Sequence, residues 1–313
     1  MATTATKIKI LSTNISKEKG TIKHPRGSIT LSGIGVEGDA HSGSWHRQVS
    51  LLAKESIEGF AHKAGRVIQY GEFAENITTE GLLLHHCHPL DRFKNEDIEL
   101  EVTQIGKECH GDDCAIFREV GNCVMPKEGV FARTINGGVL KPGDELEYIP
   151  RAVRIHIITL SDRASRGEYT DRSGPHIRHL SKKFFNEKNR PFETEITLIP
   201  DDAGKLIHII KKQVRKGVDV IFTTGGTGIG PNDITPDTVQ PMLEKEITGV
   251  MEMIRVKYGA NKPNALLSRG ISGTIGKTLV YTLPGSVKAV TEYLEVILPT
   301  IGHSILMLHG LGH

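Results

Sequence analysis

The hydrophobic pattern of this chain changes near Pro150, and the change divides its 313 residues into two parts that follow different structural rules. Before Pro150, short apolar runs are separated by glycine turns, and only Ser56–Ala64 carries apolar residues at convincing helical spacing. Many short strands with regular turns predict a mostly-β, barrel-like domain. We therefore expect two domains, residues 1–150 and residues 151–313.

After Pro150, strands and helices alternate. An apolar strand (VRIHIITLS) precedes a helical segment, Gly174–Phe185, and a second strand (FETEITLIP) precedes an amphipathic helix, Ala203–Lys216. A third strand (GVDVIFTTGG) ends in glycines, and a further helix should begin near Pro236. This alternation predicts an α/β domain with a mainly parallel sheet flanked by helices. In such sheets, ligands bind at the carboxyl ends of the strands.

Charge and apolar patterning restrict the partners of the chain. A formal net charge of +2 is too small to indicate a nucleic-acid binder, because such proteins gain affinity by releasing many counterions. The first residues lack the apolar region of a secretory signal, and no stretch approaches the roughly 18 apolar residues of a membrane span. We expect a cytoplasmic protein without membrane contact, in which the four cysteines are thiols or ligands rather than disulfides.

The most specific local pattern is a glycine loop with acids on either side of it. Gly225–Gly228 follows a buried strand, Asp233 and Asp237 come soon after, and Asp201 ends the preceding strand. Bare backbone amides bind phosphate oxygens, and Mg²⁺ is usually held by one or two carboxylates plus substrate phosphates. The residues predict a Mg-dependent nucleotide or phosphate-ester site. A ligand-free glycine connection is the alternative for the loop, and an ordinary helix start is the alternative for Asp237.

The second half also resembles the MoaB/Mog-type molybdopterin adenylyltransferases. The matching segments are ITLSDRASRGEYTDRSGP, LIPDD, DVIFTTGGTGIGPNDITPDT and ALLSRGISGTIGKTLVYTLPG. The resemblance implies that the terminal phosphate of molybdopterin attacks the α-phosphorus of Mg-ATP and that pyrophosphate leaves. It also implies a homotrimer. Asp201 and Asp233 match the two key acids, expected to hold Mg²⁺, and Ser268 matches a serine linked to pterin handling.

The resemblance assigns further positions to nucleotide or pterin binding. At one of them the chain departs from the family, because Ser286 occupies a slot that often carries Asn or Gln. Arg269 and Lys277 are candidate phosphate partners, although each could equally be a solvated loop cation. The positions expected to bind substrate, with Asp237 included for its place beside the loop, are Ser161, Asp162, Arg163, Gly225, Gly226, Thr227, Gly228, Asp237, Arg269, Pro284, Gly285 and Ser286.

The first half resembles the MOSC domain over about residues 5–148, on segments such as GVEGDAHSGSWHRQVSLL, LEVTQIGKECH and KPGDELE. The resemblance implies a module that binds or sulfurates the molybdenum cofactor, with Cys109 as its thiol. His41, His46 and Arg47 could contact an anionic pterin phosphate, because such side chains donate directional hydrogen bonds to oxyanions. The alternatives are a partly buried free thiol at Cys109 and a turn-stabilising network around Asp39 and His41.

Three other hypotheses stay open. A zinc site would use Cys109, His110, Cys114 and Cys123, although their spacing lacks the usual pairing. A non-catalytic carrier of molybdopterin would keep the glycine loop without needing two acids. A sulfur-carrier protein would rely on Cys109 chemistry, with a sulfur donor or a molybdenum-insertion protein as its partner.

Overall fold

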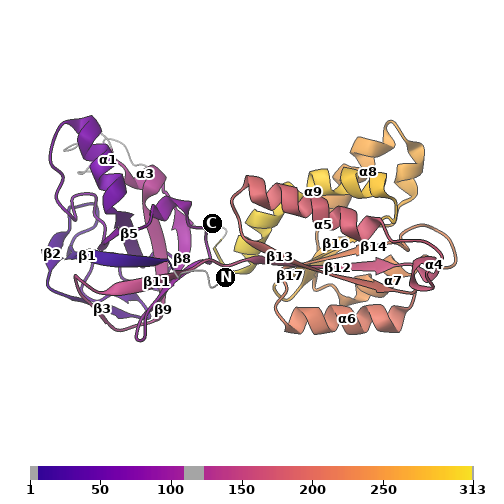
Figure 1. Cartoon of the computed structure of the whole chain (residues 1–313), viewed down its shortest axis with the longest axis horizontal. Coiled ribbons are helices and arrows are strands. Elements are labelled where there is room, and N and C mark those ends of the chain that lie inside the picture. The colour runs from indigo at the N-terminus through magenta and orange to yellow at the C-terminus, as the bar shows by residue number, and fades with distance from the viewer. Residues whose placement is uncertain (1–5, 109–122, 312–313) are drawn as a thin grey trace. The chain divides into compact units, whose positions relative to one another are not determined.

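The computed structural model describes residues 6–108 and 123–311, and the chain divides into two compact units between Arg151 and Ala152 (Figure 1). The N-terminal unit is built on seven strands that close into a barrel, because the last strand in sheet order pairs back to the first. In order around the barrel these strands are β11 (Glu145–Ile149), β7 (Arg92–Lys94), β8 (Glu99–Ile105), β9 (Val130–Asn136), β5 (Val49–Ala53), β6 (Ile77–Glu80) and β1 (Lys7–Ile15).

Smaller elements complete this unit. β2 (His24–Arg26) pairs with β1 in antiparallel orientation. A separate three-stranded sheet contains β10 (Val139–Leu140), β3 (Ile29–Ser32) and β4 (Gly35–Val36). The helical elements are α1 (Lys54–Ala64), η1 (Leu84–His86) and α3 (Met125–Glu128). The barrel interior is apolar because buried and exposed residues alternate along strands such as β1, where Ile8 and Ile10 are fully buried.

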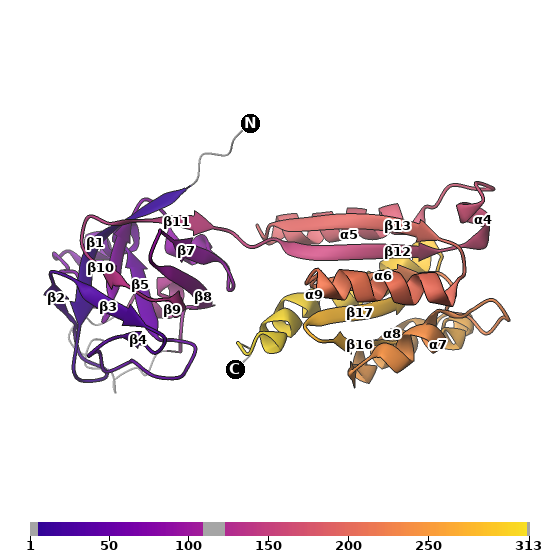
Figure 2. The ribbon, with the colours of Figure 1, turned by 90° about the horizontal axis from the view of Figure 1, so that it is seen from below.

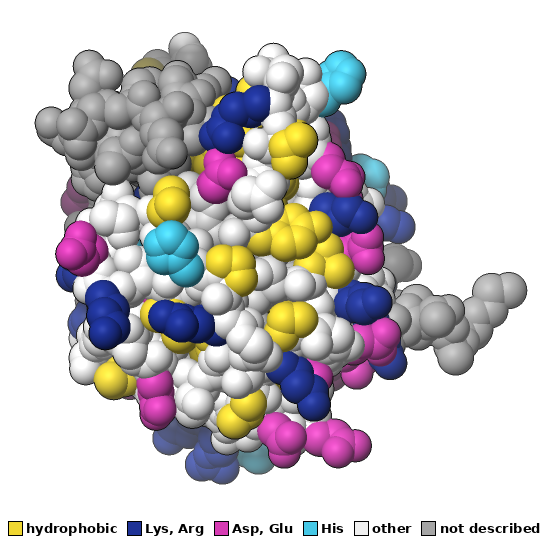
Figure 3. Space-filling view, turned by 90° about the vertical axis from the view of Figure 1, so that its left-hand side faces the viewer, with side chains coloured by type: hydrophobic (Ala, Val, Ile, Leu, Met, Phe, Trp, Pro, Cys, Tyr) yellow, Lys and Arg dark blue, Asp and Glu magenta, His cyan; other side chains and the backbone are white. Residues whose placement is uncertain are grey.

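One face of the N-terminal unit mixes charges of both signs. Figure 3 shows Lys and Arg side chains interspersed with Asp and Glu around small groups of hydrophobic side chains. On this face, therefore, no continuous basic surface is formed, in keeping with the small net charge of the chain.

The C-terminal unit contains a six-stranded mixed sheet. Four parallel strands run in the order β13 (Phe192–Ile199), β12 (Val153–Leu160), β14 (Val220–Thr224) and β17 (Thr278–Leu283). β16 (Ser272–Ile275) and β15 (Lys245–Glu246) continue the sheet in antiparallel pairing. The expected sheet was mainly parallel. The antiparallel edge follows from the short Gly276-Lys277 connection, which is long enough for a hairpin but too short for a parallel crossover.

Helices cover both faces of this sheet. α5 (Ser173–Glu187), α8 (Thr248–Gly259) and α9 (Val287–Leu308) lie on one face, whereas α6 (Ala203–Arg215) and α7 (Thr235–Val239) lie on the other (Figures 1 and 2). The short helices α4 (Asp162–Ser165), η3 (Gln240–Met242) and η4 (Pro263–Leu267) belong to the connections. Among the described residues, no helix has the length and apolar character needed to cross a membrane.

Candidate active site

The carboxyl ends of the four parallel strands bring the predicted site segments to one edge of the sheet. β12 ends at Leu160, β13 at Ile199, β14 at Thr224 and β17 at Leu283. The segments that follow β12, β14 and β17 contribute Tyr169, Gly225–Gly228 and Pro284–Ser286 to the lining of a cavity of about 580 Å³, which α8, η4 and α9 complete. The sequence order of the strands therefore brings most of the predicted segments to the same edge of the sheet.

The glycine loop has a backbone conformation that other residues would not tolerate. Gly225 has φ +104°, and a Cβ at this position would overlap the carbonyl oxygen of Leu160. The Gly225 N–H donates to the carbonyl of Leu283 at 3.0 Å, and the Thr235 hydroxyl donates to the carbonyl of Gly225 at 2.8 Å. Strands β12, β14 and β17 therefore hold the loop in place where it lines the cavity.

Asp233 and Asp201 lie against this loop. The Gly230 N–H donates to Asp233 Oδ2 at 2.8 Å, and a Cβ at position 228 would lie only 2.6 Å from the same oxygen. Asp201 Oδ1 lies 3.6 Å from the Cβ position of residue 226. Asp233 lines the cavity, whereas Asp201 is not among the lining residues.

The electrostatics of Asp201 suit a cation at this edge. Burial raises the pKa of Asp201 above its usual range, a hydrogen bond from the Asp162 N–H opposes the shift, and the charges of Asp162 and Asp233 add to it. Like-charged carboxylates repel one another unless a cation or a proton lies between them. Mg²⁺ in proteins is usually held by one or two carboxylates plus substrate phosphates, so two carboxylates beside the glycine loop fit the expected ion.

Ser161 and Ser286 act as helix caps beside the cavity. The Ala164 N–H donates to Ser161 Oγ at 3.2 Å, and the Ala289 N–H donates to Ser286 Oγ at 3.2 Å. Ser286 therefore begins α9, a helix of 22 residues whose amino-terminal end borders the cavity. The amides and dipole at such an end favour anions. Pro284 and Gly285 also line the cavity as predicted.

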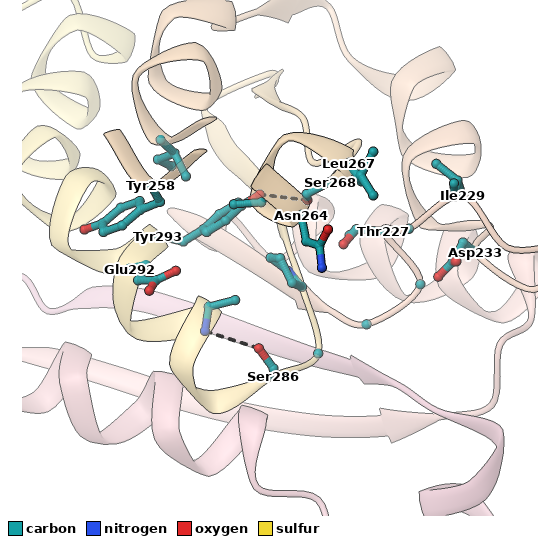
Figure 4. A pocket seen from close by; sticks show the side chains of 18 of the residues that line it. Thr227, Ile229, Asp233, Tyr258, Asn264, Leu267, Ser268, Ser286, Glu292 and Tyr293 are labelled. Carbon is teal, nitrogen blue, oxygen red and sulfur yellow. Dashed lines mark hydrogen bonds between the residues drawn. The ribbon is translucent and has the colours of Figure 1, made fainter. Parts of the chain in front are cut away.

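Ser268 is held by an aromatic residue. The Tyr293 hydroxyl donates to Ser268 Oγ at 2.7 Å, and Tyr293 is 5% exposed (Figure 4). In the same view, Asp233 and Thr227 lie on one side of the pocket, whereas Tyr258, Tyr293 and Glu292 lie on the other. The pocket therefore has a glycine-loop end that suits phosphates and an aromatic end.

Sequence reasoning missed the aromatic end. Ala289, Glu292 and Tyr293 line the cavity from α9, and Tyr258 and Asn264 line it from α8 and η4. The spacing of the three α9 residues, i, i+3 and i+4, places them on one helix face. The sequence shows this spacing, but the spacing alone does not distinguish a helix face that borders a cavity from one that packs into the core.

Five predicted binding residues lie outside the cavity lining, namely Ser161, Asp162, Arg163, Asp237 and Arg269. Arg163 is 70% exposed in its side chain and contacts Glu168 and the ring of Tyr169. Arg269 forms a two-point ion pair with Asp237, at 2.8 and 2.9 Å, so neither charge points freely at a ligand. Asp162 also lies outside the lining and instead pairs with Asp201.

The structure does not bring Lys277 to the site. Lys277 occupies the turn before β17, whereas the site lies beyond Leu283 at the other end of the same strand. The candidate phosphate role of Lys277 is therefore wrong, because strand direction separates it from the glycine loop.

Comparison with known proteins decides the family. Residues 156–303 match the family model described as a probable molybdopterin binding domain, and residues 38–147 match the MOSC domain. A molybdenum cofactor biosynthesis protein B from Bacillus cereus is 37% identical over 164 residues, which cover 51% of this chain and 93% of that protein. The chain belongs to the MoaB/Mog family. Its N-terminal unit is a MOSC domain.

Two longer relatives match the same MoaB/Mog half. A molybdenum cofactor biosynthesis bifunctional protein from Chlorobaculum tepidum is 36% identical over 168 residues, 53% of this chain and 51% of the relative. Gephyrin from Dictyostelium discoideum is 36% identical over 162 residues, 50% of this chain. The chain spans about half of the first relative and 22% of the second.

The MOSC domain has a small pocket of about 120 Å³ that brings together three basic side chains, His41, Arg47 and Lys107. Trp45 and Phe131 form aromatic walls, and the Arg47 guanidinium lies 4.9 Å from the centre of the Trp45 ring. His41 and Arg47 were predicted to act together, and the structure places them in one pocket.

Asp39 and His46 have other partners. Asp39 is buried in an ion pair with Lys23, whose Nζ lies 2.6 Å from each carboxylate oxygen. Burial alone would raise the pKa of Asp39, but hydrogen bonds from His41 and Lys23 and the Lys23 charge lower it well below its usual range. His46 lies 3.2 Å from Gln104 Oε1 and does not line the pocket. The turn network expected around Asp39 is therefore present.

The zinc and sulfur-transfer hypotheses rest mainly on Cys109, His110 and Cys114, which lie outside the residues that the structure describes. Among the residues that the structure describes, no cluster of three or more His, Cys, Asp or Glu side chains could hold a metal ion. Cys87, which lies within the run His85-His86-Cys87-His88, is buried, and burial together with the Asp91 charge raises the pKa of its thiol to about 12. A thiol with such a pKa is a poor thiolate ligand.

Proposed function

We propose that the MoaB/Mog domain adenylylates molybdopterin with Mg-ATP. In this reaction an oxygen of the terminal phosphate of molybdopterin attacks the α-phosphorus of ATP. A new P–O bond forms, the bond between the α-phosphorus and the bridging oxygen breaks, and pyrophosphate leaves. Transfer of this kind depends on positioning and charge neutralisation more than on a covalent nucleophile.

The residues of the chain would divide these tasks. The Gly226–Gly228 amides and the amino-terminal end of α9 would bind phosphate oxygens, because both offer N–H groups at the cavity. Asp233 and Asp201 would hold Mg²⁺, which offsets the charge of the transferring phosphates when bound. The hydroxyl of Ser268, fixed by Tyr293, would orient the pterin substrate from the cavity wall.

One observation carries the proposal: Asp233 and Asp201 both lie against the glycine loop, Asp233 close to position 228 and Asp201 close to position 226. A carrier without catalysis would need the loop but not two carboxylates beside it. The direct test is pyrophosphate release from Mg-ATP with and without molybdopterin. Pterin-dependent release supports the adenylyltransferase. A folded protein that binds molybdopterin but releases no pyrophosphate would instead be a carrier.

We propose a second role for the MOSC domain, which is to bind the cofactor through an anionic group. The support is the pocket of His41, Arg47 and Lys107, in which the Arg47 Nε is buried without a hydrogen-bond acceptor among the described residues. At about 120 Å³ the pocket suits a phosphate rather than a whole pterin. Loss of cofactor binding in Arg47→Gln, with the circular dichroism spectrum unchanged, would support this role, and unchanged binding would contradict it.

Sulfur transfer by Cys109 is the alternative activity of this domain. Incubation with a sulfur donor followed by mass spectrometry would detect a persulfide on Cys109. Its absence while the cofactor still binds would leave binding as the role of the domain.

A further inference from the structure

Arg269 makes an unusual number of contacts with the loop that carries Asp233. Its backbone N–H donates to the carbonyl of Thr227 at 2.9 Å. Its Nε donates to the carbonyl of Gly228 at 2.8 Å, and one terminal nitrogen donates to the carbonyl of Asp233 at 2.6 Å. One residue therefore clamps both ends of the segment between Thr227 and Asp233.

Asp237 fixes the guanidinium in this position. Its two carboxylate oxygens accept from both terminal nitrogens of Arg269, at 2.8 and 2.9 Å. A two-point pair of this kind sets the plane of the guanidinium as well as its distance. The remaining donors of Arg269 then face the loop carbonyls instead of the cavity.

The clamp and the Asp233 carboxylate act on the same turn. Asp233 Oδ2 accepts from the Gly230 N–H at 2.8 Å and lies close to Gly228. Arg269 donates to the carbonyls of Gly228 and Asp233 in the same turn. Arg269 therefore holds the backbone from which the Asp233 side chain extends.

We propose that Arg269 is a positioning residue that sets the Asp233 carboxylate in its cation-binding place, with Asp237 as its counter-ion. The inference rests on the proposed role of Asp233. Arg269 does not line the cavity, so it acts through Asp233 and not by touching substrate phosphate. It also links two site segments, because Ser268 precedes it in the chain while its side chain holds the glycine loop.

The test compares the cation affinity of single and double variants. The probe is the Mn²⁺ complex of α,β-methylene-ATP, whose α–β linkage cannot be cleaved, and protein-bound Mn²⁺ is followed by electron paramagnetic resonance. Arg269→Lys keeps the charge but loses the planar fork, so we expect binding at least about 10-fold weaker than in wild type. Asp233→Asn should weaken binding as strongly.

The double variant separates positioning from a general structural effect. If Arg269 acts through Asp233, Arg269→Lys combined with Asp233→Asn should bind within about twofold of Asp233→Asn alone, because coupled residues are not additive. Additive losses would overturn the proposal, as would wild-type affinity in Arg269→Lys. Failure of the wild-type protein to bind the Mn²⁺ complex would overturn it as well.

Arg154→Lys is the matched control. Arg154 also donates to two backbone carbonyls of a turn, those of Lys216 and Gly217, but it lies at the opposite end of β12. Its variant should bind the Mn²⁺ complex like wild type. If Arg269→Lys fails to fold, Asp237→Asn tests the same clamp, with an expected loss of about threefold, and unchanged affinity there contradicts the proposal.

Turnover adds a readout that distinguishes this inference from the proposed reaction. Arg269→Lys should lower kcat at fixed Mg²⁺ while the KM for molybdopterin stays within about twofold. If wild type releases no pyrophosphate but the Mn²⁺ affinities follow the expected pattern, the adenylyltransferase proposal fails and the positioning role stands.

Discussion

Asp162 and Asp201, which follow neighbouring strands, each accept a hydrogen bond from the backbone N–H of the other, at 3.0 and 3.1 Å. The pairing fixes both carboxylates at the carboxyl edge of the sheet. It also brings a second negative charge close to Asp201, whose pKa is raised by burial and by the charges of Asp162 and Asp233. The Asp162 charge therefore contributes to the raised pKa of Asp201.

Asp162→Asn should extend activity to lower pH. Asp201 must be ionised to bind a cation, and its raised pKa places loss of activity at a higher pH than for an ordinary aspartate. Removing the Asp162 charge lowers the Asp201 pKa, so the acidic limb of the kcat/KM profile for ATP should move to lower pH. The Asn oxygen can still accept from the Asp201 N–H. A limb that stays in place or moves to higher pH would show that Asp201 does not control it.

Asp233→Asn should lower pyrophosphate release by about 10²–10³-fold, which corresponds to the ~2.7–4 kcal/mol of one lost electrostatic stabiliser. The amide oxygen can still accept from the Gly230 N–H, so folding should persist. Asp202→Asn is the control, because the Asp202 side chain caps α6 by accepting from the Lys205 N–H and Asn caps nearly as well. Near-normal turnover in Asp233→Asn would remove the Mg-ligand role.

Gly225→Ala should destabilise the MoaB/Mog domain by about 3 kcal/mol or more, because a methyl group would meet the Leu160 carbonyl at a positive φ. Gly276→Ala should cost only about 1–2 kcal/mol, since its φ is also positive but its Cβ would meet open space. Urea unfolding followed by circular dichroism compares the two. Equal losses would mean that the loop relaxes around the added methyl group.

The single tryptophan gives this experiment an internal reference. Trp45 lies in the MOSC domain, so its fluorescence reports on that domain alone. Gly225→Ala should move the circular dichroism transition of the other domain and leave the Trp45 transition in place. A shift of both transitions would show that the domains unfold together.

Asp39→Asn should destabilise the MOSC domain by about 3–5 kcal/mol, because it leaves the buried ammonium of Lys23 without its anionic partner. The Trp45 fluorescence transition in urea measures the loss. Glu145→Gln is the control, since it breaks the Lys7–Glu145 pair at the surface and should not move the midpoint measurably. A small effect of Asp39→Asn would indicate that Lys23 becomes neutral or finds another acceptor.

Local pattern in the sequence determined the architecture and the edge at which the site lies. The period of apolar residues distinguishes strand from helix, and strands that alternate with helices run parallel, so their carboxyl ends meet. Gly225, Asp201 and Asp233 could therefore be placed together before any coordinates. The spacing of segments also indicated both families.

Only the tertiary structure decided which side chains reach the ligand. Asp233 and Asp237 are four residues apart, yet one lines the cavity and the other holds Arg269, 32 residues along the chain. His46 was expected to contact the ligand but lies beside Gln104, whereas Lys107, for which the sequence predicted no role, lines the MOSC pocket. Periodicity encodes which face a residue occupies. The partner it meets there depends on how distant segments pack, and a local pattern holds no information about that.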